Sequence, residues 1–128
     1  MSIKNFNIIG KPQIKVDGIE LVTGSAKFAG DLKFPDMVYG YAARSGIPSA
    51  KLKKIQIDKA LAVDGVIDIL TADNLLGPNL IGVMPPFDQP VLAKDEIRYA
   101  GESVAFVIAE TKRTAKRAAA LVTTEIDP

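Results

Sequence analysis

The last third of the chain carries the most regular pattern in the sequence and limits the possible folds most strongly. Residues 104–109 form a continuous apolar run, which is typical of a strand buried on both faces. Thr111 follows where its side chain can cap a helix, which we predict to reach about Leu121. Apolar residues recur at helical spacing at Ala115, Ala118, Ala119 and Val122. Because this stripe consists mainly of alanines, we expect the helix to lie close against the sheet and to cover the buried strand.

The segments before this unit carry further strand signals. We predict a strand at 37–45 in the centre of a sheet, because β-forming residues lie on both of its faces. A second strand at 50–57 has an interrupted alternation between residues 52 and 55, which indicates a bulge or an edge position. Two more strands are predicted at 66–70 and 122–126.

Short helical pieces and a long loop are expected between these strands. Asp58 can cap a helix over 59–63, which Asp64-Gly65 would end. Residues 71–76 have room for one turn of helix. Residues 77–90 are rich in proline and are expected to form a loop, and loops of this length usually have a function or contact a partner. The order of the elements predicts a compact α+β domain.

The first 36 residues have little periodicity. Turn formers such as Gly10, Asp17-Gly18, Thr23-Gly24 and Gly30-Asp31 interrupt them, which favours short extended pieces over helices. We interpret residues 1–36 as an arm that needs another surface to lie against, and residues 37–128 as the folded domain.

Composition excludes several kinds of chemistry. The chain has no Cys and no His, so thiolate catalysis, disulfides, iron–sulfur ligation and imidazole acid–base chemistry are not available to it. A net charge of +1 gives no electrostatic attraction to nucleic acid or to an anionic membrane. We find neither a secretory signal nor an apolar run of the ~18–20 residues that span a bilayer. A cysteine-free chain fits the cytoplasm, where we expect this one.

No residue is predicted to be catalytic or to hold a metal or cofactor. The Asp17-Gly18 and Gly30-Asp31 pairs are explained by turn chemistry. Glu102, beside the buried strand, is a candidate general base. An ion pair or a backbone hydrogen bond is the more common role for such a residue. Arg44 and Arg98, near strand ends, are expected to be structural partners of carboxylates.

Two surface features were weighed as binding sites. The predicted helix has a basic face without interleaved aromatic residues, which favours a solvated surface over a nucleic-acid site; it consists of Lys112, Arg113, Lys116 and Arg117. The 77–90 loop is the better candidate for contact with another domain, because it includes Met84, Pro85, Pro86 and Phe87. The glycines do not form a dinucleotide-binding fingerprint.

Four groups of segments resemble the large subunit of the molybdenum hydroxylases, the xanthine dehydrogenase and aldehyde oxidase family. They are residues 9–12 with 16–18 and 22–31; 35–40 with 44–45; 55–58 with 63–67, 71–74 and 77–79; and 90–105 (PVLAKDEIRYAGESVA) with 108–111. The resemblance runs from about residue 8 to the C-terminus, and the last group is the most distinctive. Two departures affect local loop shape: residues 46–50 differ from the family pattern, and Ser103 stands where the family usually has proline.

The resemblance implies an α/β-hammerhead fold and a structural or docking role at the N-terminus of a larger subunit. It also implies a parent oxidoreductase that hydroxylates an N-heterocycle or an aldehyde with oxygen from water. The molybdopterin cofactor of such an enzyme would be bound by other domains of the same subunit. Iron–sulfur clusters and FAD would be held by other domains or subunits, and the base glutamate would lie downstream, so the isolated chain is expected to be inactive.

Two alternatives remain at this stage. One is a carrier domain of the lipoyl or biotinyl type, in which a lysine at the tip of a tight turn is modified; Lys94 lacks the flanking pattern for this role. The other is a stand-alone domain that binds a small molecule or a protein. A reading frame that continues for several hundred residues would exclude the second alternative.

Overall fold

The computed structural model describes residues 7–127. The chain divides into two compact units, residues 1–35 and residues 36–128, and each is described by itself. The larger unit is a small α+β domain, as the sequence predicts.

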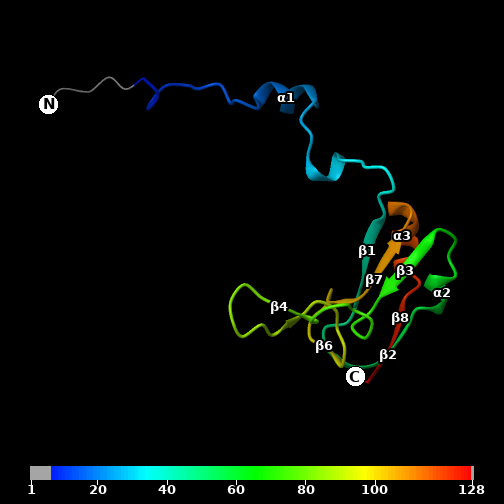
Figure 1. The fold of residues 1–128 in the computed structure, drawn as a ribbon. Coiled ribbons are helices and arrows are strands. Elements are labelled where there is room, and N and C mark those ends of the chain that lie inside the picture. Colours follow the sequence, from blue (N-terminus) through cyan, green and yellow to red (C-terminus); the bar gives the residue numbers. More distant parts are fainter. Residues whose placement is uncertain (1–6, 128) are drawn as a thin grey trace. The chain divides into compact units, whose positions relative to one another are not determined.

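The larger unit is built around a three-stranded antiparallel sheet (Figure 1). Its central strand, β7 (Ser103–Ala109), lies between β1 (Tyr39–Arg44) and β3 (Val66–Leu70). Helix α3 (Lys112–Ala119) packs on one face of this sheet, against β1 and β7. The central position of the strand and the alanine stripe that covers it are confirmed, since Ala115 and the alanines of α3 one turn later are buried. The expected burial of both faces was wrong, because the face opposite α3 has no covering helix and Phe106 on it is 38% exposed.

A second antiparallel sheet contains β6 (Glu96–Ile97), β2 (Ala50–Gln56) and β8 (Thr123–Asp127), with β2 in the middle. The register of β2 against β8 shifts between Leu52 and Lys54, which confirms the bulge predicted from the interrupted alternation. Two of its residues, Ala50 and Leu52, are buried, and Lys51 between them is exposed.

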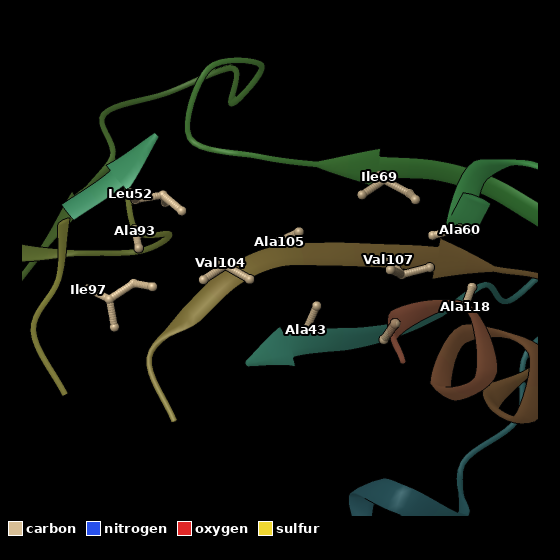
Figure 2. Packing of buried hydrophobic residues seen from close by; sticks show 11 residues of the cluster. Ala43, Leu52, Ala60, Ile69, Ala93, Ile97, Val104, Ala105, Val107 and Ala118 are labelled. Atoms are coloured by element: carbon tan, nitrogen blue, oxygen red, sulfur yellow. The ribbon is translucent and has the colours of Figure 1, made fainter. Parts of the chain in front are cut away.

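The hydrophobic core follows β7 along its length (Figure 2). Around Val104, at the start of the strand, lie Leu52, Ala93 and Ile97. Towards the other end, Val107 lies among Ile69, Ala60 and Ala118. Alanine fills many of these positions, so the covering elements approach the sheet closely.

The prediction that residues 37–45 form a central strand was wrong. β1 starts at Tyr39 and lies at the edge of its sheet, because β7 occupies the centre and β3 takes the other side. Its apolar residues on both faces do not require a second neighbouring strand, since α3 covers one face and the other is partly exposed.

The predicted short helices differ in detail. α2 (Asp58–Leu61) is shorter than expected, and Ile57 occupies the cap position without a side-chain hydrogen bond, so Asp58 is not the cap. Residues 71–76 form a turn and not a helix. There the Asn74 side chain closes the turn by accepting a hydrogen bond from Thr71 N at 2.6 Å.

Residues 77–90 are not a structureless loop. A short ladder joins β4 (Leu80–Ile81) to β5 (Gln89–Pro90), and the Asn79 side chain makes two hydrogen bonds to the backbone of Leu92. These two-residue strands and β6 are too short to produce a periodic signal in the sequence.

The smaller unit also departs from the predicted extended pieces. It contains a six-residue helix, α1 (Gly18–Thr23), and a 3-10 turn at Ala29–Asp31, and no residue of either element is buried. Gly24 ends α1 in the left-handed conformation that glycine adopts most readily, with φ of 72°. The glycine interpreted as a turn former is therefore a helix C-cap.

Candidate functional site

The turn before β7 is organised by Glu102, the one buried carboxylate among residues 7–127, which is 2% exposed. Its Oε2 accepts a hydrogen bond from the backbone N–H of Arg98 at 2.6 Å. The same turn is joined to the end of β1, because Ser45 N donates to Glu102 O and Gly101 N donates to Ser45 O, both at 2.8 Å. Glu102 therefore makes the backbone hydrogen bond expected from the sequence and stabilises this turn.

The two arginines have different partners. Arg98 Nε lies 3.3 Å from Glu96 Oε1, so the expected carboxylate pairing is confirmed for Arg98. Arg44 instead donates from Nη1 to the carbonyl of Gly101 at 2.8 Å, so the expected carboxylate partner was wrong. Both arginines contact the turn before β7, Arg44 through its side chain and Arg98 through its backbone N–H.

A polar cleft of about 230 Å³ is lined by β2, the turn after β3 and residues 93–94, and it includes three lysines, Lys53, Lys54 and Lys94. Two of them are already paired: Lys53 with Asp127 at 3.2 Å and Lys94 with Asp73 at 3.4 Å. Exposed pairs of this kind contribute little to stability, but they lower the positive charge that the cleft offers.

The turn residues of the smaller unit have local roles. Asp31 Oδ2 accepts a hydrogen bond from Phe28 N at 3.1 Å, and Asp17 lies 3.3 Å from the ammonium group of Lys15. Gly18 is the first residue of α1. Turn and helix-end chemistry therefore accounts for both pairs that the sequence offered as ligand contacts.

Helix α3 begins as predicted, because Thr114 N donates to the side-chain oxygen of Thr111 at 3.1 Å. Its four basic residues are all exposed, which agrees with a solvated face.

The donor set of the described residues does not fit a metal centre, and the composition offers no ligand for an iron–sulfur cluster. Over residues 7–127, no three acidic side chains gather closely enough to hold an ion, and the chain has no Cys or His to supply. Iron–sulfur clusters are held by cysteine thiolates, with histidine in some cases. None of the helices in the described part of the chain could cross a membrane.

Exposed large apolar side chains are concentrated in two segments. All ten in residues 7–35 are at least a third exposed, and Val16 is 102% exposed. In the segment between β3 and β5, Val83 is 101% exposed, and Leu76, Met84 and Phe87 are also exposed. The second group lies within the 77–90 segment or beside it, which the sequence identified as a contact region.

A third apolar surface was missed by the sequence analysis. Residues alternate between the faces of β7, so Phe106 lies on the face opposite α3. Beside it is a hollow of about 400 Å³, here named the Phe106 groove. Its apolar lining consists of Ala42, Leu70, Leu75, Val91, Leu92 and Phe106. Arg44 and Ser103 are its polar residues. The small residues of β1 that face Phe106 were the sequence signal for this groove. They could be interpreted only once the pairing of β1 with β7 was known.

Comparison with known proteins gives consistent results at the level of sequence. Residues 23–128 match the family model described as "Aldehyde oxidase and xanthine dehydrogenase, a/b hammerhead domain". The chain is 37% identical, over 97% of its length, to the nicotinate dehydrogenase large molybdopterin subunit of Eubacterium barkeri. It is 40% identical, over 92% of its length, to a probable xanthine dehydrogenase chain of Bacillus subtilis. The chain spans only 29% and 16% of the lengths of these relatives.

Solved structures give the same picture of the fold. CO dehydrogenase from Oligotropha carboxidovorans superposes with a TM-score of 0.86 at 31% identity, over 93% of this chain and 15% of that one. Aldehyde oxidoreductase from Desulfovibrio desulfuricans superposes with a TM-score of 0.81 at 26% identity, over 88% of this chain and 14% of that one.

Proposed function

Because this chain belongs to the α/β-hammerhead domain family of aldehyde oxidases and xanthine dehydrogenases, we propose that it is a structural and docking domain of a molybdenum hydroxylase large subunit. The parent enzyme would hydroxylate an N-heterocycle or an aldehyde with oxygen from water, at a molybdopterin cofactor bound by other domains of that subunit. Iron–sulfur and FAD domains or subunits would complete the electron path. We place this enzyme in the cytoplasm, in keeping with the cysteine-free composition.

The observation that carries the docking role is the exposure of apolar side chains outside the core. Residues 7–35 expose every large apolar side chain they contain, and the segment around Val83 adds a second apolar surface. Exposed apolar patches of this kind mark contact surfaces in soluble proteins. The chain spans only a small share of each relative, which supports the idea that the rest of a longer subunit covers these exposed apolar side chains.

The chemistry of the described residues supports a role without catalysis. The buried carboxylate, Glu102, accepts a backbone hydrogen bond, and the arginines beside it hold the turn. No step of the reaction is therefore assigned to this chain.

A split-subunit experiment tests the proposal. The coding sequence is expected to continue well beyond residue 128, and residues 1–128 would be co-expressed as a separate chain with that remainder. The two pieces should copurify, with molybdenum in the second piece. Replacing Ile14, Val16 and Val22 together with serine should weaken copurification, whereas Arg113→Ser on the exposed face of α3 should not. A reading frame that ends near residue 128, or pieces that do not associate, would refute the docking role.

A further inference from the structure

The Phe106 groove lies on the face of the β1–β7–β3 sheet that α3 leaves uncovered. Its floor comes from three adjacent strands, because Phe106 of β7 pairs with Ala42 of β1 on one side and with Leu70 of β3 on the other. Leu75 and Val91 come from the segments that follow β3 and β5. With an apolar lining and a volume of about 400 Å³, the groove can take an apolar side chain.

The position of Phe106 is fixed by a glycine. A Cβ atom at Gly40 would lie 2.2 Å from Cζ of Phe106, so the ring lies directly over the Gly40 backbone. Gly40 pairs with Ile108, two residues along β7 from Phe106, which places the ring diagonally across the two strands. The ring is 38% exposed and lies over the Gly40 backbone, so it forms one side of the groove in this structure without any occupant.

The groove contains one charged residue, Arg44. Its guanidinium group makes the hydrogen bond to Gly101 O, and none of the ion pairs formed within residues 7–127 includes it. A guanidinium group has five N–H donors arranged to bind a carboxylate through two of them. The groove therefore combines an apolar lining with unused donors for an anion.

We propose that the Phe106 groove receives an apolar side chain flanked by a carboxylate, from the cofactor-binding part of the parent subunit. The choice of this source rests on the proposed function: the relatives are several times longer than this chain and supply the additional polypeptide. The chemistry of the occupant rests on the groove alone. An apolar segment with a lysine or arginine at the same place would bring two cations together.

Fragment binding to the ¹⁵N-labelled 128-residue chain tests the chemistry of the groove independently of the parent subunit. The probes are 3-phenylpropionate, 3-phenylpropan-1-ol and 3-phenylpropylamine at constant ionic strength. Amide shifts should change at Ala42, Leu70 and Phe106. The carboxylate should bind about two- to five-fold more tightly than the alcohol, as expected for a partly exposed ion pair, and the amine should bind most weakly.

Two variants separate the contributions of charge and apolar surface. Arg44→Gln should remove the preference for the carboxylate while leaving the alcohol bound, and Phe106→Ala should weaken all three probes. Gly46→Ala is the matched control, because a Cβ there meets no atom within 4 Å. Equal binding of amine and carboxylate, a preference that survives in Arg44→Gln, or shifts confined to other surfaces would overturn the proposed chemistry.

The source of the occupant is tested in the full-length subunit. Leu75→Cys should react readily with a maleimide in the 128-residue chain and at least about tenfold more slowly in the full-length subunit, while Arg113→Cys should react at similar rates in both. If the fragments bind as expected but Leu75→Cys stays equally reactive, the rest of the subunit does not cover the groove and this inference fails. The docking role would still be decided by the split-subunit experiment.

Discussion

Residues 7–35 and residues 36–127 differ in the burial of their large apolar side chains. The first segment contains ten large apolar residues and buries none of them, whereas the second builds a continuous core along β7. The difference lies in the available partners. β7 is paired on both sides with strands far away in the sequence, but α1 has six residues and none of them is buried. Short helices need such packing, because isolated helices of this length are marginal in water.

Hydrogen exchange on the monomeric 128-residue chain should show the largest contrast. Amides of β7 are expected to open only with global unfolding, which requires ~5–15 kcal/mol in a typical domain. Amides in 7–35 should exchange with almost no protection, and those in 82–88, between β4 and β5, should follow them closely. Protection of the first segment in a monodisperse monomer would show that it needs no partner and would contradict the docking role.

Truncating one buried and one exposed isoleucine sharpens the contrast. Ile69, which is 1% exposed, contacts the core beside β7, and Ile69→Ala should lower the free energy of unfolding by ~2–5 kcal/mol. Ile19→Ala in α1 should change it by less than ~0.5 kcal/mol. Urea denaturation of both variants measures this directly, and a similar loss in the two would mean that the smaller unit has a core of its own.

Overpacking the alanine stripe tests the contact between α3 and the sheet. Ala118 is fully buried, so Ala118→Leu should lower the free energy of unfolding by ~1–3 kcal/mol. Ala120→Leu is the matched control, since Ala120 is exposed at the end of the same helix. Thermal melts that coincide for Ala118→Leu and the unmodified chain would argue against close packing of the helix.

The smallest expected effect concerns the helix caps. Thr111→Ala removes the side-chain hydrogen bond at the start of α3 and should lower the free energy of unfolding by about 1 kcal/mol. Asp58→Ala should have a smaller effect, because the start of α2 has no side-chain cap. Chemical denaturation measures the free energy of unfolding of both variants. A larger decrease for Asp58→Ala than for Thr111→Ala would contradict the assignment of Thr111 as the stabilising cap.

The larger elements were predictable because their signals are local. The apolar run of β7, the cap at Thr111 and the spacing of Ala115 and Ala118 depend only on neighbouring residues, and the structure confirms all of them. The bulge in β2 was visible as a break in alternation. The two-residue strands could not be predicted, because such short strands have no periodic pattern and form only where the tertiary fold brings two segments together.

The sequence by itself determined the chemistry open to this protein and the family to which it belongs. Without Cys or His the chain has few catalytic groups, and its motifs extend through most of its length. Only the tertiary structure decided which strand is central and which partner Arg44 has, because both depend on contacts between segments more than thirty residues apart in the chain, and Arg44 and Gly101 are 57 residues apart. The Phe106 groove also arises only there, since Gly40 makes room for the ring once β1 and β7 lie in register.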